Sequence, residues 1–404
     1  MTNKVLLLDT LPDWVVTKLQ DLGCSVIVKT GVGEAEHPAL LKEINPRILI
    51  VRSTKVNRAM IEAASDLSLI IRSGAGYNTI DVAAASERSI YVSNCPGKNA
   101  IAVAELAMGL MLSLDRRIPD NVFDLRQGTW NKKEYSKAKG LYGRTLAVIG
   151  TGNIGKEVIL RAKAFGLHVV AYSRSLTPEG AEALGAQYAP SIIDAVRNAD
   201  IVSIHLALAP ELKGVINAEV LGAMKEGALF INTSRAELVD EEALIEAIKT
   251  KKLKVATDVF PKEPEQSGPF QTPLAALPQV YGTHHIGAST DQAQNAVAEE
   301  TVRIVREYLQ NGVVPNCVNV MEKTPARYQL SVRHKDKVGV LANILRVIRD
   351  NNINVQRMEN IIFAGAQGAC ANIQIEQPLS QNQLDEMVKS SDDIYEAVIT
   401  ELWG

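Results

Sequence analysis

The sequence predicts an α/β protein with two parallel-sheet domains followed by a small domain of ferredoxin-like topology. The chain has 404 residues, and one hydrophobic core rarely grows beyond about 250 residues. Through about residue 310, short apolar runs alternate with helical patterns, which is typical of parallel sheets covered by helices. From Arg327 the pattern changes to β-α-β-β-α-β, the order of a ferredoxin-like unit.

Composition and charge indicate an ordinary globular protein. Hydrophobic residues make up 46% of the chain and the net charge is −3, so we expect no overall attraction to nucleic acid. No stretch approaches the ~20 apolar residues of a membrane span, and the first apolar run is too short for a secretion signal. The four cysteines are far apart, which predicts neither a metal site nor a disulfide framework. We expect a cytoplasmic protein without metal, membrane or nucleic-acid partners.

The first hundred residues contain five apolar runs with the length and composition of buried parallel strands. They are VLLLD (5–9), SVIVKT (25–30), ILIVRS (48–53), LIIRSG (69–74) and IYVSN (90–94). Helical spacing separates several of them, which predicts a flavodoxin-like domain. A long apolar helix is expected next, over about Ala100–Leu114.

Six further runs between residues 145 and 285 predict the second parallel sheet, of the doubly wound Rossmann type. They are TLAVIG (145–150), HVVAY (168–172), DIVSIHL (200–206), ALFINTS (228–234), KVATDVF (254–260) and QVYGTHH (279–285). Helical patterns such as DEEALIEAIKT (240–250) separate the runs. A helix over Asp291–Leu309 is long enough to cross back onto another domain.

The motif GTGNIG follows the first strand of this sheet and opens a helix. Gly150, Gly152 and Gly155 permit a tight turn and let backbone amides approach a pyrophosphate. The alternative is a glycine turn that only packs helix on strand. The complete βαβ context favours a dinucleotide site that includes Asn153 and Ile154.

The second strand of a dinucleotide fold normally ends on an acidic residue that binds the ribose hydroxyls of NAD. Here the strand ends on Ser173 and Arg174. Ser173 keeps one neutral hydrogen bond, and Arg174 can pair with the 2′-phosphate of NADP. We therefore expect NAD or NADP as cofactor, with NADP accepted. The alternative is that Arg174 points to solvent, stacks on adenine or contacts the ribose, leaving NAD usable.

Three polar residues follow later strands of the same sheet, at the edge where open α/β sheets bind ligands. Arg235 can hold a carboxylate with two hydrogen bonds. His285 can take a hydroxyl proton while hydride leaves the same carbon, and Glu263 can orient the histidine. The alternative is that all three are ordinary surface-loop residues.

The segments GTGNIG, NTSRAELVD, DVFPKEP and HIGAST, in this order, resemble the D-isomer-specific 2-hydroxyacid dehydrogenases from about Val5 to Pro315. The resemblance implies that Arg235 binds the substrate carboxylate and that Glu263 pairs with the acid–base His285. Implied contacts with the cofactor come from Thr233, Ser234, Asp258 and Gly287, with Asp258 near the nicotinamide. The family usually has proline where this chain has His284, and the match to HIG favours His285 as the catalytic histidine.

The family resemblance also implies a discontinuous first domain. We expect a substrate-binding domain over residues 1–98 and 288–315, a dinucleotide-binding domain over 99–287 and a linker over 316–326. Residues 327–404 begin with RYQLSVRHKDKVGVLANILRVIRDNNINV, which resembles an ACT domain, an amino-acid-sensing module. His334, Asp336 and Asn354 are then candidate contacts for L-serine as effector, although Asp336 stands where related chains commonly have asparagine. The alternative is a purely structural dimerisation domain.

A 2-hydroxyacid dehydrogenase with an ACT domain implies oxidation of 3-phospho-D-glycerate to 3-phosphohydroxypyruvate, the first step of L-serine biosynthesis, in a dimer or tetramer. The backbone at Ala75 and Gly76 would meet the carboxylate. Candidate cations for the phosphate are Arg52, Arg72 and Lys132 or Lys133, which could also be solvated surface charges. The alternatives are a glyoxylate or hydroxypyruvate reductase and a non-catalytic, nucleotide-sensing corepressor.

Overall fold

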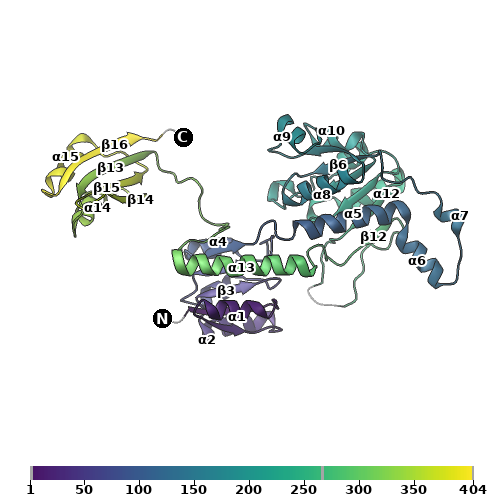
Figure 1. Ribbon diagram of the computed structural model, residues 1–404, viewed down its shortest axis with the longest axis horizontal. Helices are drawn as coiled ribbons and strands as arrows, with labels where there is room; N and C mark the ends of the chain where they lie inside the picture. The colour runs from purple at the N-terminus through teal and green to yellow at the C-terminus, as the bar shows by residue number, and fades with distance from the viewer. Residues whose placement is uncertain (1–2, 265–267, 403–404) are drawn as a thin grey trace. The chain divides into compact units, whose positions relative to one another are not determined.

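The computed structural model describes residues 3–264 and 268–402 and divides into two compact units, one through Asn319 and one from Val320 onward (Figure 1). The first unit contains two parallel sheets, and the second contains an antiparallel sheet. No helix in the described ranges is long and apolar enough to cross a membrane.

The first sheet has five parallel strands in the order β2-β1-β3-β4-β5, which is the flavodoxin-like order. Its strands are β1 (Asn3–Leu7), β2 (Cys24–Val28), β3 (Ile48–Val51), β4 (Leu69–Arg72) and β5 (Tyr91–Asn94). Its helices are α1 (Trp14–Asp21), η1 (Glu34–Glu36), α2 (His37–Ile44), α3 (Arg58–Ala63) and α4 (Val82–Glu87). All five predicted strands are present.

The second sheet has seven strands in the order β12-β11-β10-β9-β6-β7-β8. They are β6 (Thr145–Ile149), β7 (His168–Tyr172), β8 (Gln187–Tyr188), β9 (Ile201–Ile204), β10 (Leu229–Asn232), β11 (Lys254–Thr257) and β12 (Val280–Gly282). The sequence predicted six. The strand it missed, β8, is two residues long and too short to show a strand period.

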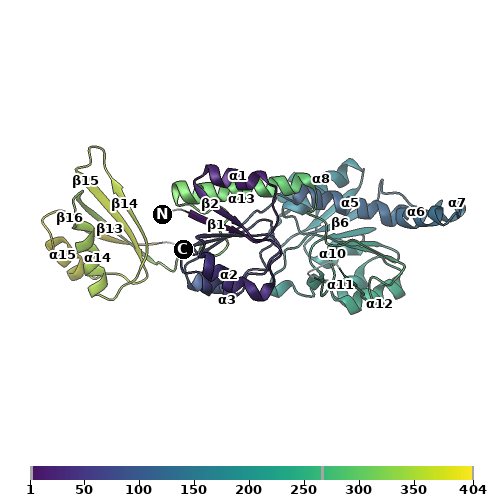
Figure 2. The same ribbon diagram turned by 90° about the horizontal axis from the view of Figure 1, so that it is seen from below.

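Helices cover both faces of this sheet (Figures 1 and 2). The helices of this part of the chain are α5 (Ala100–Arg116), α6 (Ile118–Arg126), α7 (Lys132–Tyr135), α8 (Asn153–Ala164), α9 (Pro178–Ala183), α10 (Ile192–Arg197), α11 (Ala218–Ala223) and α12 (Glu241–Lys251), with single turns η2 (Pro210–Leu212) and η3 (Ala236–Leu238). Of these, α6 and α7 project away from the sheet (Figures 1 and 2). Along β6, Leu146 and Val148 enter one core while Ala147 and Ile149 enter the other. Because both faces are buried, the strands are continuously apolar, which made them visible in the sequence.

Helix α13 (Asp291–Asn311) returns the chain from the second sheet to the first. Thr290 caps its start by accepting a hydrogen bond from the N–H of Ala293 at 3.1 Å, and Gly312 ends it in the left-handed conformation. Buried side chains of α13, among them Val302, share a core with β1 and β4. The helix lies beside α1 (Figure 2). The domain boundaries given above stay predictions.

The second unit has the order β-α-β-β-α-β and a four-stranded antiparallel sheet, β14-β15-β13-β16. Its elements are β13 (Tyr328–Lys335), α14 (Val340–Asp350), β14 (Val355–Ile362), β15 (Gly368–Ile375), α15 (Gln381–Lys389) and β16 (Ile394–Glu401). Val340, Ile344, Val347 and Ile348 form the buried face of α14, with the spacing of an amphipathic helix. The predicted ferredoxin-like topology is therefore confirmed.

Candidate active site

The central pair of the candidate site joins two loops beyond the second sheet. Nδ1 of His285 lies 2.6 Å from Oε2 of Glu263, and the side chains are 47% and 32% exposed. Oε1 of Glu263 accepts a hydrogen bond from the N–H of Phe260 at 2.8 Å. Burial alone would raise the pKa of Glu263, but the bonds from His285 and Phe260 and the charge of Arg235 lower it overall. The carboxylate is therefore charged when it faces the imidazole.

Asp258 fixes the loop that carries His285. Its buried carboxylate accepts hydrogen bonds from the hydroxyl of Thr283 at 2.6 Å and from the N–H groups of Ile286 at 2.9 Å and Gly287 at 2.8 Å. His285 has a positive φ of 52°, which is unfavourable for a residue with a side chain. The hydrogen bonds to Asp258 come from residues on both sides of His285, and they hold this conformation. Asp258 thus positions His285, a role additional to the cofactor contact expected from the sequence.

Arg235 reaches the segment expected to bind the substrate carboxylate. Its Nη1 donates a hydrogen bond to the carbonyl of Ser234 at 2.7 Å. A Cβ added to Gly76 would lie only 2.3 Å from Nη2 of Arg235, so glycine permits this close approach. The structure therefore brings Arg235 to the backbone at Gly76, beside Ala75.

A cavity of about 290 Å³ lies between His285 and the carboxyl ends of β3 and β4. Its lining includes Arg52, Arg72, Gly74, Asn99, His285, Ser289 and Gln294. Nε of Arg72 is buried and has no hydrogen-bond partner among the described residues. Burial and the positive charges of Arg235 and Arg52 lower the pKa of Arg72 to about 10. The positive charges of these arginines repel one another, and an anion bound in the cavity would offset that repulsion.

Lys132 and Lys133 do not join this group of cations. They lie on the exposed helix α7, and neither lines the cavity. Their role in phosphate binding stays a prediction. The basic composition of the segment gave no information about where α7 would lie.

The glycine motif has the shape that a pyrophosphate requires. A Cβ on Gly155 would lie 1.9 Å from the carbonyl oxygen of Gly150, and one on Gly150 would lie 2.5 Å from that of His205. These glycines therefore allow close packing of helix, strand and loop. Gly152 has open space beside it and caps α8 without a side-chain hydrogen bond. The first amides of α8, at Asn153 and Ile154, can therefore bind an anion.

Other predicted cofactor residues lie at the same edge of the sheet. Ser173 and Arg174 follow β7, and Thr233 and Ser234 follow β10. Ser234 Oγ donates to the carbonyl of Ile204 at 2.7 Å, whereas Thr233 Oγ1 is buried without a partner among the described residues. Thr233 thus has unused hydrogen-bonding capacity.

His205 is a buried polar residue at this edge that the sequence analysis did not single out. Its Nε2 lies 2.8 Å from Ser203 Oγ, and its Nδ1 has no partner within the described ranges. Burial lowers the pKa of His205 to about 3, so the ring is neutral. The sequence could have indicated His205 by its position near the end of the run DIVSIHL, at the same sheet edge as the other site residues.

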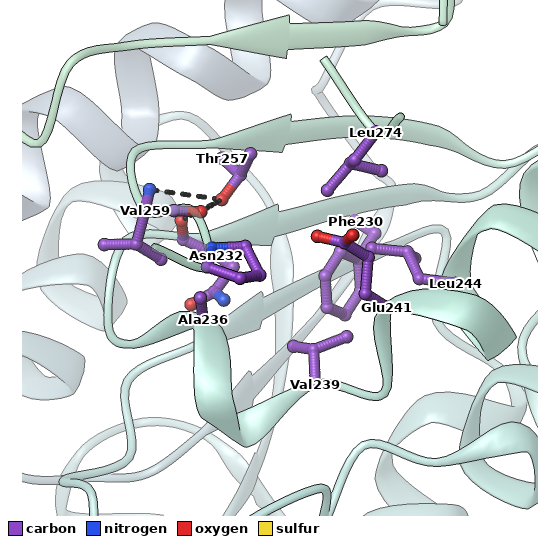
Figure 3. Close-up of a pocket in the computed structure, with 10 residues that line it drawn as sticks. Phe230, Asn232, Ala236, Val239, Glu241, Leu244, Thr257, Val259 and Leu274 are labelled. Atoms are coloured by element: carbon purple, nitrogen blue, oxygen red, sulfur yellow. Dashed lines mark hydrogen bonds between the residues drawn. The ribbon is translucent and has the colours of Figure 1, made fainter. Parts of the chain in front are cut away.

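A smaller pocket of about 20 Å³ lies beside β10 and β11 (Figure 3). Figure 3 shows the carboxylate of Glu241 close to Phe230 and Leu244, with Thr257 at the other end of the pocket. Burial raises the pKa of Glu241, whose Oε2 has no partner among the described residues. The volume suits about one water molecule, too little for a substrate.

The predicted effector residues differ in their surroundings. His334 is 1% exposed, with Nδ1 2.7 Å from the carbonyl of Lys335 and Nε2 3.1 Å from Oδ1 of Asn360. Both ring nitrogens of His334 thus lie against oxygen atoms of the chain. Asp336 and Asn354 are exposed. An effector molecule can therefore reach the side chains of Asp336 and Asn354 more easily than the buried ring of His334.

Comparison with known proteins places this architecture among known dehydrogenases. The D-isomer specific 2-hydroxyacid dehydrogenase NAD binding domain matches residues 108–287. D-3-phosphoglycerate dehydrogenase from Methanocaldococcus jannaschii is 38% identical over 368 residues, covering 90% of this chain and 67% of that protein. Hydroxypyruvate reductase from Thermotoga maritima is 42% identical over 257 residues, covering 63% of this chain and 82% of that protein.

NAD⁺-bound 3-phosphoglycerate dehydrogenase from Entamoeba histolytica has a TM-score of 0.67 and 25% identity, covering 80% of this chain and 100% of that one. The present chain spans 56 to 64% of several phosphoglycerate dehydrogenases that it matches. It belongs to the D-isomer specific 2-hydroxyacid dehydrogenases.

Proposed function

We propose that the chain oxidises 3-phospho-D-glycerate to 3-phosphohydroxypyruvate, reversibly, as the first step of L-serine biosynthesis. The observation that carries this proposal is the cluster of Arg52, Arg72 and Arg235 beside the cavity lined by His285. One arginine suffices for a carboxylate, so the additional cations suit a second anionic group such as a phosphate.

The residues have separate tasks in this reaction. His285 accepts the proton of the substrate hydroxyl, because Glu263 occupies its other ring nitrogen at 2.6 Å and stabilises the imidazolium. Arg235 orients the substrate carboxylate against the backbone at Gly76. A bound nicotinamide supplies the hydride acceptor. In the reverse direction His285 returns the proton.

The substrate is tested by steady-state rates with phosphoglycerate, glycerate and 2-hydroxyglutarate. Arg52→Ala should raise KM for phosphoglycerate by roughly tenfold or more, the worth of a charge-assisted hydrogen bond, and leave glycerate kinetics nearly unchanged. Arg58→Ala, which removes an exposed arginine paired with Glu87, is the matched control. Equal activity on glycerate and phosphoglycerate would contradict the proposal.

A glyoxylate or hydroxypyruvate reductase is the second candidate, favoured by the 42% identity to the Thermotoga maritima enzyme. Such an enzyme needs no phosphate site, so Arg52→Ala should not change its preference among substrates. A non-catalytic corepressor, the third alternative, would show no turnover with any of them.

NADP is proposed as an accepted cofactor, beside NAD. Ser173 has no negative charge to repel a 2′-phosphate, and Arg174 can pair with one. The test is the ratio of kcat/KM for the two cofactors in wild type and Arg174→Ala. A wild-type preference for NAD above about a hundredfold, roughly 2.7 kcal/mol, would contradict this proposal, as would a ratio that Arg174→Ala leaves unchanged.

A homo-oligomer, dimer or tetramer, in the cytoplasm is also proposed. Its support is a group of exposed apolar side chains on and after α6, because exposed apolar groups often mark surfaces that bind another protein chain. The side chains of this group are Ile118, Val122, Phe123, Leu125 and Trp130. Phe123→Glu should lower the molar mass measured by light scattering, whereas Phe165→Glu, on the turn after α8, should not.

A further inference from the structure

An ion pair between two loops lies at the predicted ribose end of the cofactor site. Nη1 of Arg174 is 3.5 Å from Oε1 of Glu211. The residues are 37 positions apart, so the fold brings them together and the local sequence does not. The side chains are 88% and 59% exposed, which makes the pair weak and exchangeable.

The order of strands explains why the two residues meet. β7 and β9 pair with opposite sides of β6. The turn after β7, with Arg174, and the loop after β9, with Glu211, therefore flank the glycine motif that follows β6. In an open parallel sheet, this edge is where the ribose and pyrophosphate of a dinucleotide bind.

Arg174 and Glu211 both lie in turns that are held by a backbone hydrogen bond and by a neighbouring leucine packed against a core. Glu211 lies in η2, where the N–H of Leu212 donates to the carbonyl of Ala209 at 2.9 Å and the Leu212 side chain packs against the core. Beside Arg174, the N–H of Leu176 donates to the carbonyl of Ser173 at 3.1 Å, and Leu176 packs against the other core. The backbone positions are thus fixed while the charged tips can change partners.

We infer that Glu211 is a specificity-determining residue whose carboxylate competes with a 2′-phosphate for Arg174 and supplies the negative charge absent at Ser173. The inference rests on the proposed cofactor site. With NAD bound, Arg174 keeps its pair with Glu211. With NADP bound, the phosphate displaces Glu211 and lies near its charge, so Glu211 reduces the advantage that Arg174 alone gives to NADP.

Direct binding to the full-length protein tests this inference. Dissociation constants for NADPH and NADH are measured by nicotinamide fluorescence in wild type, Glu211→Gln, Arg174→Ala and the double variant. Glu211→Gln should shift the affinity ratio toward NADPH by roughly two- to fivefold, the range of an exposed ion pair. The shift should shrink in the Arg174→Ala background and at high salt.

Two controls isolate the ribose position. Glu246→Gln removes an exposed carboxylate from α12, which connects β10 and β11 on the other side of β9 from β7, and should leave the ratio unchanged. Competition by adenosine 2′,5′-bisphosphate against 5′-AMP should repeat the shift seen with the dinucleotides, because the two compounds differ only at the 2′-position.

The possible results distinguish a failure of the role inferred for Glu211 from a failure of the proposed cofactor site. An unchanged ratio in Glu211→Gln, or an equal shift with and without Arg174, would overturn the inference and leave the proposed cofactor site standing. Failure of the wild type to bind either dinucleotide would overturn both.

Discussion

Nδ1 of His285 lies 2.6 Å from Oε2 of Glu263, whose other oxygen is held by the N–H of Phe260. The pair thus has a fixed direction: the backbone orients the carboxylate, and the carboxylate orients the ring. Nε2 has no hydrogen bond within the described part of the chain and is the nitrogen free to exchange a proton with a substrate.

Glu263→Gln should lower kcat by roughly ten- to a hundredfold, a part of the effect of a positioned acid–base group. A neutral amide no longer favours the charged imidazolium. The pH at which oxidation reaches half its maximal rate should therefore fall. Rates measured across pH 5 to about 9 test this, and an unchanged profile would contradict the assigned role.

His285→Ala should lower kcat by about two to four decades while cofactor binding, measured by fluorescence, stays intact. His284→Ala is the matched control, because His284 is also exposed and adjacent in sequence. Its effect should be much smaller. A larger loss in His284→Ala would reverse the choice between the two histidines.

Asp258→Ala should destabilise the loop that holds His285. The substitution leaves one hydroxyl and two N–H groups without their acceptor, at about 1–3 kcal/mol for each group that stays buried. Urea unfolding should show a loss of about 3 kcal/mol or more, together with lower kcat. Asp240→Ala, which removes an exposed helix cap bound to the N–H of Ala243, should cost only about 1 kcal/mol. Equal losses would show that Asp258 is no more than a local cap.

The elements that the sequence predicted best are those whose signal lies within one segment. Parallel strands are apolar on both faces, so ten of the strands in the two parallel sheets coincide with predicted runs, and β12 occupies the middle of the run 279–285. The glycine motif was readable because its turn, strand and helix are consecutive. Gly150 and Gly155 pack as their spacing implied.

What the sequence could not show depends on segments that meet only in the fold. Lys132 belongs to a basic stretch, but no local pattern reveals that α7 does not line the cavity. His334 is a candidate effector contact, but no local pattern shows that Oδ1 of Asn360, on β14, will lie 3.1 Å from its Nε2. Glu211 carries no local sign that it will face Arg174. Tertiary placement decides the role of each of these residues.

Glu300 should make stability dependent on pH in the acidic range. Its side chain is 6% exposed and accepts hydrogen bonds from Arg303 at 2.6 Å and Asn316 at 2.7 Å, with Lys98 at 3.3 Å. The bond from Arg303, opposed by burial and assisted by Asn316, lowers the pKa of Glu300 to about 2.

A lowered carboxyl pKa contributes stability above the unfolded value, near about 4.3, and this contribution is lost as pH falls toward about 2. Glu300→Gln should therefore lower Tm at pH 7 and flatten the dependence of Tm on pH below about 4.3. Glu299→Gln, at the exposed neighbouring position of α13, should retain the wild-type slope. A steep slope in both variants would assign the acid sensitivity to other groups.

Residues 327–404, within the compact unit that begins at Val320, are proposed as an ACT domain that binds L-serine and lowers activity. This unit has its own core, formed by residues such as Leu330, Ile344 and Ile373. Deletion after Met321 should therefore leave the first unit folded and active but insensitive to serine.

Asp336→Ala is the sharper test of the effector site. Asp336 is exposed, so the substitution should abolish serine binding in calorimetry without lowering Tm. His334→Ala would instead remove a buried ring whose nitrogens lie beside the carbonyl of Lys335 and Oδ1 of Asn360, and should cost about 1–3 kcal/mol of stability. D-serine serves as the ligand control, because only a site shaped by several contacts distinguishes the enantiomers. If the intact protein did not bind L-serine, the second unit would keep only a structural role.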